Sequence, residues 1–342
     1  MSKTKIAIIG CGSIGNRHVA VVDANVNTEL VAICDIDKKA GRTLSAKYDN
    51  VPYFESLESM LNDIEADIIH VCTPHHLHCK MAILALEKKF NVLVEKPMAL
   101  SVIDCRKMID KATEVNRKLY VVMQNRYNVP VKLVDDALSE NHLGKILMVK
   151  CDILWNRHDA YYSDSPWRGK IKTEGGALYT QASHFIDLLV FWFGNISGAQ
   201  VITDTLTHTI EIEDCGIASL GFSSGIIGSI NWTTSVYNKN YEGSVTIIGE
   251  KGTVKIGGKY LNKIDYWDVK DYPLEEGIDF DDKPNSYGKY QGTSSNHDKV
   301  VTQMIKHLKG ENVDMVEGEE GLKSIAAIEL IYDQAKTTKI QR

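Results

Sequence analysis

The chain has 342 residues, more than one typical hydrophobic core holds, so we expect about two domains. Its hydrophobic and charged fractions, 44% and 25%, are ordinary for a globular protein, and a net charge of −6 argues against a nucleic-acid-binding protein, whose surface is normally basic. No apolar run approaches the ~20 residues of a membrane span, and the lysine-containing N-terminus leads into a predicted strand rather than a signal segment. The seven scattered cysteines suit reduced thiols in the cytoplasm better than a disulfide framework.

Residues 5–35 have the pattern of a nucleotide-binding unit. A short apolar strand leads into the motif GCGSIG, an amphipathic helix follows, and a second apolar run ends at Asp35. The first glycine permits a tight turn, the second lets the backbone approach a pyrophosphate, and the third lets the helix pack on the strand, while the N–H groups at the helix start attract phosphate. Because a carboxylate accepts ribose hydroxyls and repels a 2′-phosphate, we predict a bound dinucleotide, NAD rather than NADP. The predicted contacts are Gly10, Gly12, Ser13, Ile14, Gly15 and Asp35.

The first third of the chain alternates short apolar runs with helical patterns. Strands are expected at 6–9, 30–34, 68–72, 92–94 and 120–123, and helices at 77–89 and 101–117. Continuous apolar runs are typical of strands that are buried on both faces of a parallel sheet. We therefore predict an α/β fold with a doubly wound Rossmann domain over residues 1–124.

From residue 125 onward, longer strands dominate. Helices are expected near 131–141 and 177–193, strands at 145–155, 199–209, 216–222 and 225–237, and a hairpin at 245–248 and 253–256. Residues 225–237 alternate between apolar and polar, which buries one face of a strand. Residues 271–295 are expected to form a long loop, before helices near 296–309 and 319–336. This pattern predicts a second α/β domain, 125–342, with a large, mostly antiparallel open sheet.

Three segments follow predicted parallel strands at the end where a doubly wound sheet binds ligands. The first, CTPHHLH at 72–78, is dense in His and Cys. Its residues cross a strand end, a turn and a helix start, so we favour a cofactor-lining turn over a metal site. The last, Gln124-Asn125-Arg126, is placed to contact cofactor or substrate.

The middle segment is Glu95-Lys96-Pro97. Pro97 restricts Lys96 to extended geometry and so fixes how the two charged side chains project. A lysine directed at a substrate hydroxyl can exchange its proton and stabilise the oxyanion. The alternative is a solvated Glu-Lys pair at a strand end.

A polar face is predicted on the helix within residues 175–187. In an α-helix, Thr180, Gln181, His184 and Asp187 share one face, because they are three and four residues apart. His184 is either a core histidine with Asp187 as its partner or a functional group. An aromatic and cationic cluster before this helix could stack on a ring, grip a phosphate or pack at a rim: Tyr161, Tyr162, Trp167 and Arg168.

Together and in this order, GCGSIG, CTPHHLH, VEKP, QNRY, SPWRG and GGALYTQASHFIDLL resemble the Gfo/Idh/MocA family of NAD(P)-dependent sugar oxidoreductases. The resemblance covers essentially the whole chain, and the combination of EKP with a later H-x-x-D helix is specific to this family. It implies a Rossmann domain joined to an α/β domain whose open sheet commonly forms the oligomer interface. A homo-oligomer, dimer or tetramer, is therefore expected.

The resemblance also implies residue roles. Lys96 corresponds to the catalytic lysine, Glu95 lies near the nicotinamide ribose, and His184 contacts the oxygen on the reacting sugar carbon. Many members carry Asp where this chain has Thr180, which leaves acid–base duty to Lys96 and His184 and speaks against an inositol dehydrogenase. Further cofactor contacts are expected at Thr73, Pro74, His78, Glu95, Lys96, Gln124, Trp167 and Arg168. Substrate contacts are expected at Lys96, Arg126, Tyr127, Arg157, His158, Tyr162, Thr180, Gln181 and His184, and no metal is expected.

The segment WNRHDAYYSDSPWRG and the helix after it look most like the nucleotide-sugar branch of the family. Members of that branch oxidise C3 of UDP-N-acetylglucosaminuronic acid on the way to 2,3-diamino sugars of surface polysaccharides. Such a substrate needs cationic partners, which Arg126, Arg157, His158 and Arg168 would supply. The alternatives are a dehydrogenase or ketoreductase of another sugar or cyclitol, a glycosidase that uses held NAD for transient oxidation, and a non-catalytic NAD-sensing regulator like the galactose-repressor branch.

Overall fold

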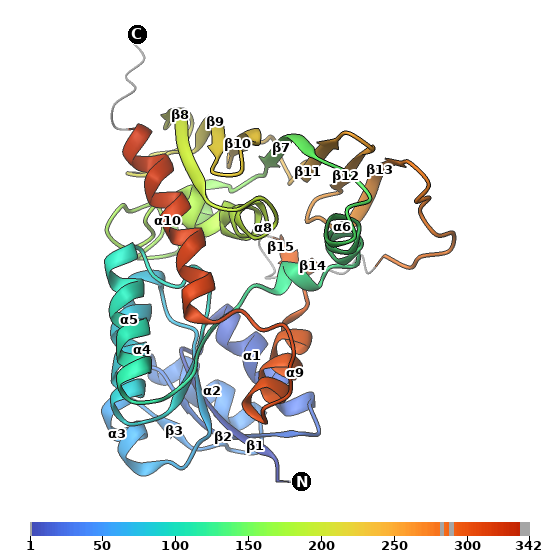
Figure 1. Ribbon diagram of the computed structural model, residues 1–342. Coiled ribbons are helices and arrows are strands. Elements are labelled where there is room, and N and C mark those ends of the chain that lie inside the picture. Colours follow the sequence, from blue (N-terminus) through green and yellow to red (C-terminus); the bar gives the residue numbers. More distant parts are fainter. Residues whose placement is uncertain (1, 281–283, 287–290, 336–342) are drawn as a thin grey trace. The chain divides into compact units, whose positions relative to one another are not determined.

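The chain divides into two units in the computed structural model, which describes residues 2–280, 284–286 and 291–335 (Figure 1). The first unit consists of Met1–Met123 and His297–Ile325, and the second of Gln124–Asn296 and Ala326–Arg342. The sequence-based division after residue 124 assigned the whole C-terminal part to the second domain. The structure groups helix α9 (His297–Leu308) with the first unit, because its buried apolar face packs on α1 (Ser13–Ala24).

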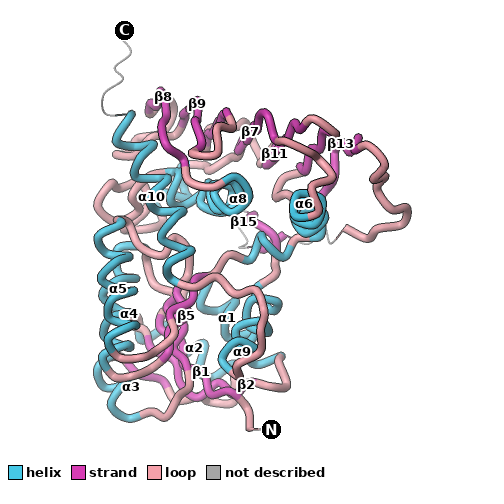
Figure 2. The backbone as a smooth tube through the Cα atoms, viewed as in Figure 1, coloured by secondary structure: helices cyan, strands magenta, loops and turns pink. Residues whose placement is uncertain are grey.

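The first unit contains a six-stranded parallel sheet in the order β3-β2-β1-β4-β5-β6, which confirms the predicted Rossmann arrangement. Its strands are β1 (Thr4–Ile9), β2 (Thr28–Cys34), β3 (Tyr53–Phe54), β4 (Ile68–Val71), β5 (Asn91–Val94) and β6 (Leu119–Val121). Its other helices are α2 (Lys38–Lys47), α3 (Leu57–Asp63), η1 (His75–Leu77), α4 (His78–Glu87) and α5 (Val102–Glu114), and Figure 2 shows how they alternate with the strands. The strand order reverses between β1 and β4, so ligands are expected beyond the carboxyl ends of these two strands.

The second unit is built on a seven-stranded sheet in the order β13-β12-β11-β7-β10-β9-β8. Its strands are β7 (Ile146–Leu154), β8 (Ile196–Asp204), β9 (Cys215–Phe222), β10 (Ile227–Thr233), β11 (Glu242–Gly249), β12 (Gly252–Gly257) and β13 (Lys263–Val269). Only the β7–β10 pair within this sheet is parallel, which confirms the predicted mostly antiparallel sheet. The unit's helical segments are η2 (Gln124–Tyr127), α6 (Val129–Ser139), α7 (Asp159–Ser163), η3 (Leu178–Ala182) and α8 (Ser183–Phe193).

Several predicted boundaries differ from the structure. β8 ends at Asp204 rather than at 209, because Asp214 accepts the backbone N–H groups of Leu206, Thr207 and His208 and turns the chain away from the sheet. Within the expected loop 271–295, β14 (Pro284–Ser286) pairs with β15 (Gln291–Ser294). The helix predicted over 177–193 begins with the π-helical segment η3.

The last helix, α10 (Gly318–Ala335), contains the boundary between the two units. Its first part packs on the Rossmann sheet: a Cβ on Gly321 would lie 2.6 Å from the Val121 side chain. Within the described residues, no helix has both the length and the apolar character needed to cross a membrane. All seven cysteines are free thiols.

Candidate functional site

The glycine loop is closely packed at its first and third glycines and open at its second. Gly10 has a φ of +97°, and a Cβ there would lie 2.5 Å from the carbonyl oxygen of Cys72. A Cβ on Gly15 would lie 1.8 Å from the carbonyl oxygen of Gly10, so helix α1 approaches β1 only because this residue lacks a side chain. A Cβ on Gly12 would meet nothing within 4 Å, although Gly12 caps the start of α1. The space beside Gly12 is where a pyrophosphate could approach the helix start.

The Asp35 carboxylate is held beside this loop. Its Oδ2 accepts the N–H of Cys11 at 2.6 Å, and its Oδ1 accepts the N–H of Asp37 at 2.8 Å. The Tyr53 hydroxyl donates to the Asp35 carbonyl at 2.9 Å. Asn16 braces the loop itself by donating to the carbonyls of Cys11 and Gly12. The half-buried carboxylate is therefore oriented before any ligand arrives.

These residues fit a dinucleotide. Ser13 and Ile14, predicted contacts, are the first two residues of α1, so their N–H groups belong to the helix start. Thr73 follows β4, and its buried hydroxyl oxygen has no hydrogen-bond partner among the described residues. Bound NAD requires an open backbone approach at the second glycine and an acidic acceptor for the ribose, which Gly12 and Asp35 supply, and the Thr73 hydroxyl can make one further hydrogen bond.

The histidine-rich turn does not gather its side chains around one point. His78 is fully buried, and its two ring nitrogens lie 2.8 Å from the carbonyl oxygens of Thr73 and Pro97. Burial lowers the pKa of His78. His76 is exposed, and Pro74 precedes the short helix η1. His78, predicted as a cofactor contact, thus ties together the two turns that follow β4 and β5.

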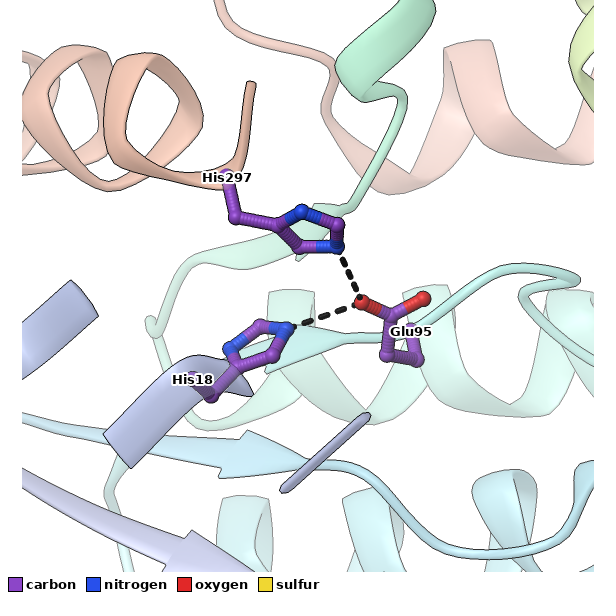
Figure 3. Close-up of side chains that lie close together, drawn as sticks. All are labelled: His18, Glu95 and His297. Atoms are coloured by element: carbon purple, nitrogen blue, oxygen red, sulfur yellow. Dashed lines mark hydrogen bonds and ion pairs between the residues drawn. The ribbon is translucent and has the colours of Figure 1, made fainter. Parts of the chain in front are cut away.

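Glu95 is a buried carboxylate held by histidines from distant parts of the chain (Figure 3). Its Oε1 lies 2.8 Å from His18 Nε2 and 3.3 Å from His297 Nε2, and its Oε2 accepts the N–H of Lys96 at 3.1 Å. His18 Nδ1 lies 3.0 Å from Nδ1 of the buried His70. Burial alone would raise the pKa of Glu95, but the hydrogen bonds from His18 and His297 hold it well below its usual range. The carboxylate is therefore ionised inside the first unit.

His18, Glu95 and His297 also have the residue types of a metal site, with ligand atoms within 4.8 Å of one another. Two ligands of one tetrahedral zinc ion would lie about 3.4 Å apart, given bonds of about 2.0–2.1 Å. The 2.8 Å separation between His18 and Glu95 is instead that of a hydrogen bond. Sequence reasoning missed both histidines. His18 had the weak signal of a polar residue on the buried face of α1, and His297 had none.

Lys96 follows Glu95 directly and is half-buried, and its peptide bond to Pro97 is cis. Its backbone N–H is the group that Glu95 Oε2 accepts. The buried carboxylate thus fixes the backbone from which the lysine side chain projects. Glu95 and Lys96 belong to the first unit, together with the glycine loop and Asp35.

His184 lies in the second unit, in the first turn of α8, and is 1% exposed. The predicted shared α-helical face is interrupted, because η3 is a π-helix with wider turns that shift the side chains after it. Every α8 residue from Ser183 to Val190 is buried, so the helix has no solvated side over this stretch. Within η3, the Gln181 side chain accepts from Arg157 at 2.6 Å and donates to the Tyr161 hydroxyl at 3.0 Å.

Arg126 and Asp187, considered separately in the sequence, form a bidentate ion pair. Arg126 Nε and Nη2 each donate to an Asp187 oxygen at 2.7 Å, and the guanidinium lies 4.1 Å from the centre of the Phe191 ring. Asp187, one possible partner for His184, thus pairs with the arginine that we predicted as a substrate contact. Both side chains are largely buried.

Two arginines flank one aromatic ring in the second unit. The guanidinium carbon of Arg168 lies 4.0 Å from the centre of the Tyr161 ring, and that of Arg157 lies 5.3 Å from it. Arg157 is buried and donates to the Asn240 side chain at 3.1 Å and the Asn156 carbonyl at 2.7 Å, in addition to Gln181. We call Arg157, Arg168 and Tyr161 the arginine cluster.

Six other predicted contacts also lie in the second unit. Tyr162 is buried and donates to the Thr234 hydroxyl, His158 is half-buried at the start of α7, and the half-buried Trp167 lies beside Arg168. The remaining predicted residues are the buried Gln124 and half-buried Tyr127 in η2, and the half-buried Thr180 in η3. Trp167, Arg168 and Gln124 therefore lie in a different unit from the other predicted cofactor contacts.

Two family models match the chain in succession. The oxidoreductase family model with an NAD-binding Rossmann fold matches residues 4–123, and the model of its C-terminal alpha/beta domain matches residues 136–341. The WlbA dehydrogenase from Bordetella pertussis, solved in complex with NADH and UDP-GlcNAcA, is 35% identical with a TM-score of 0.87 over 98% of this chain and 97% of that chain. The WlbA dehydrogenase from Chromobacterium violaceum, in complex with the same two molecules, is 35% identical with a TM-score of 0.90 over 98% and 95%.

A more distant curated relative is the D-glucoside 3-dehydrogenase of Escherichia coli, which is 21% identical over 98% of this chain and 96% of its own. Both family models therefore match in the expected order, and the structure has the two corresponding folds. The chain belongs to the Gfo/Idh/MocA family of oxidoreductases, and its first unit contains the family's NAD-binding Rossmann fold.

Proposed function

We propose that the chain catalyses the NAD-dependent oxidation of C3 of a nucleotide sugar, UDP-N-acetylglucosaminuronic acid (UDP-GlcNAcA). The observation that carries this proposal is the arginine cluster. Its Arg157 guanidinium is buried, the Arg168 guanidinium is half-buried, and both lie against the Tyr161 ring. Guanidinium groups bind carboxylates and phosphates, so the cluster suits the uronate or pyrophosphate of such a substrate. The two WlbA dehydrogenases in complex with UDP-GlcNAcA support the same substrate.

The chain's own residues would position the sugar and move the proton. Bound NAD⁺ supplies the acceptor for the hydride that leaves C3. Lys96 takes the proton from the C3 hydroxyl, so the C–H bond and the O–H bond break as the ketone forms. His184 orients the same oxygen. Thr180 cannot share this role, because it lacks the carboxylate that many family members carry at this position. Glu95 holds the Lys96 backbone and faces the nicotinamide ribose.

The test is a panel of sugars with NAD, in which the absorbance of the reduced cofactor is followed. UDP-GlcNAcA should be oxidised. UDP-N-acetylglucosamine, which lacks the uronate, and N-acetylglucosaminuronic acid, which lacks the nucleotide, should each react much more slowly. Equal rates with and without the nucleotide would contradict the assignment to a nucleotide sugar.

The panel also separates the other candidate functions. Oxidation of a simple glucoside in preference to UDP-GlcNAcA would indicate the activity for which the Escherichia coli relative is named. Release of free sugar without net reduced cofactor would indicate a glycosidase. Binding of NAD without turnover of any sugar would indicate a regulator.

We also propose that the open sheet of the second unit joins copies of the chain into a homo-oligomer. The sheet register places Ile248, Met148 and Ile227 in one row, and Ile202 beside Ile217 in another, and all five are at least partly exposed. An exposed apolar face of this kind marks an interaction surface. Ile217→Lys should lower the mass measured by light scattering, whereas Ile103→Lys, on α5, should not. An unchanged mass for Ile217→Lys would exclude this interface.

A cytoplasmic location follows from the same proposal, because NAD and nucleotide sugars are cytoplasmic metabolites and the cysteines are free thiols. Recovery of the native protein in the membrane or secreted fraction would contradict it.

A further inference from the structure

The start of the helix that carries His184 is held by side chains from other parts of the second unit. Glu213 Oε1 accepts the N–H of Ala177 at 3.0 Å, and the Tyr332 hydroxyl oxygen accepts the N–H of Leu178 at 2.9 Å. The Tyr332 hydroxyl in turn donates to the same Glu213 oxygen at 2.6 Å. That oxygen also accepts from Trp232 Nε1 at 3.1 Å. We call Glu213 and Tyr332, with these bonds, the helix-start clamp.

The clamp is closely packed as well as hydrogen-bonded. Gly176 has a φ of +145°, and a Cβ there would lie 2.0 Å from the Tyr332 hydroxyl oxygen. The Tyr332 ring stacks on Tyr179, with 5.8 Å between ring centres. The backbone before the helix therefore fits against Tyr332 only because residue 176 has no side chain.

Such bonds at this place control where the helix begins. The first N–H groups of a helix have no partner inside it, and a side chain at the N-cap usually satisfies one of them. Here Ala177 is at the N-cap of η3 and makes no side-chain capping bond. Instead, the segment before β9 and the last helix, α10, supply both acceptors. Withdrawal from water raises the pKa of Glu213 to about 7, so placing this half-buried carboxyl beside the helix start has a free-energy cost.

The π-helix transmits the anchoring to His184. In η3 and α8 the chain runs without a break from Leu178 through Thr180 and Gln181 to His184, six residues after Leu178. A π-helical segment changes the rotational position of every residue that follows it. A helix start that moved by one residue, or relaxed to α-helix, would turn His184 and Gln181 away from their present directions.

We propose that Glu213 and Tyr332 are positioning residues that fix the register of the His184 helix, and through it the rate of sugar oxidation. The effect on rate rests on the proposed function, whereas the effect on register does not. Neither residue is expected to touch substrate, because their polar groups are directed at the helix backbone.

The experiment compares Tyr332→Phe, Glu213→Ala and Glu213→Gln with the wild-type chain. Glu213→Gln keeps an oxygen acceptor of the same shape and is the conservative control. Tyr120→Phe is the matched control for the lost hydroxyl, since Tyr120 bonds to His307 at 2.8 Å in the first unit. The first measurement is amide hydrogen exchange of the peptide covering residues 177–184, without ligand. The second is kcat with UDP-GlcNAcA, together with the Kd for NAD.

Tyr332→Phe and Glu213→Ala should speed amide exchange in residues 177–184 about tenfold, because each removes the acceptor of one N–H group at the helix start, and one hydrogen bond contributes about 1 kcal/mol. They should lower kcat by about ten- to a hundredfold with an unchanged Kd for NAD, because a misplaced catalytic group costs rate rather than cofactor binding. Glu213→Gln and Tyr120→Phe should behave like the wild type in both respects.

Unchanged exchange in residues 177–184 would overturn the clamp. Faster exchange with an unchanged kcat would overturn its positioning role. A wild-type chain that does not oxidise UDP-GlcNAcA would reject the proposed function, while the exchange data would still decide the register.

Discussion

Removing His18 should destabilise the first unit more than removing His297. Both contact the buried Glu95 carboxylate, but His18 makes a hydrogen bond of 2.8 Å, whereas His297 makes a looser ion-pair contact at 3.3 Å. A hydrogen bond to a charged group contributes about 1.5–3 kcal/mol. His18→Ala also leaves Nδ1 of the buried His70 without its 3.0 Å partner. We therefore expect a loss of about 3 kcal/mol for His18→Ala and about 1.5 kcal/mol for His297→Ala.

The assay is urea unfolding followed by two signals. All five tryptophans (155, 167, 192, 232 and 267) lie in the second unit, so their fluorescence reports that unit, whereas circular dichroism reports both. The variants should shift the part of the dichroism transition that fluorescence does not follow. His76→Ala, at an exposed histidine of the same unit, is the control and should stay within about 0.5 kcal/mol of the wild type.

A double-mutant cycle with Glu95→Gln tests the cause. If both histidines act through the carboxylate, their substitutions should cost much less in the Glu95→Gln background. Costs that add within about 0.5 kcal/mol, or a larger loss for His297→Ala than for His18→Ala, would refute the reasoning.

Three further predictions concern the cofactor site and the second unit. Asp35→Ala should weaken NAD binding about tenfold and reduce the preference for NAD over NADP, because the carboxylate that accepts the ribose hydroxyls is lost. An unchanged Kd for NAD would exclude Asp35 as a residue that binds the ribose. Asp187→Ala should cost about 3–5 kcal/mol of second-unit stability by tryptophan fluorescence, since it leaves the Arg126 guanidinium without its bidentate partner; a loss below about 1 kcal/mol would contradict the importance of this pair. Burial raises the pKa of Glu213 from 4.5 to about 7, so the folded state binds this proton more tightly than the unfolded state. Its contribution to stability is thus fully present below pH 4.5 and falls by about 3 kcal/mol by pH 7. Glu213→Gln should therefore flatten the dependence of the free energy of unfolding on pH, measured from pH 4.5 to 8. An equal dependence in both proteins would refute the assignment of the raised pKa to Glu213.

The parts of the fold set by local patterns were predictable from the sequence. Five of the six strands of the first unit were predicted as short apolar runs, whereas the two-residue strand β3 was not. The glycine loop needs close packing at Gly10 and Gly15 that no other residue allows. The alternating strand β10 has Ile230 and Trp232 buried and Ile227 exposed, as period-two alternation predicts.

Features that depend on distant residues were not predictable. His297 meets Glu95 only because α9 returns to the Rossmann unit, some 200 residues after β5 in the chain. The Arg126–Asp187 pair and the helix-start clamp likewise join segments whose own patterns carry no signal for each other. The helical periodicity of the sequence did not predict the π-helix, because the register of η3 is stabilised by Glu213 and Tyr332 rather than by residues within it.

The proposed reaction is tested most directly by UDP-GlcNAcA carrying deuterium at C3. If hydride leaves C3, the reduced cofactor formed with NAD should contain one deuterium by mass spectrometry. Lys96→Ala should abolish its formation while NAD still binds. Reduced cofactor without deuterium, or undiminished turnover by Lys96→Ala, would contradict the account.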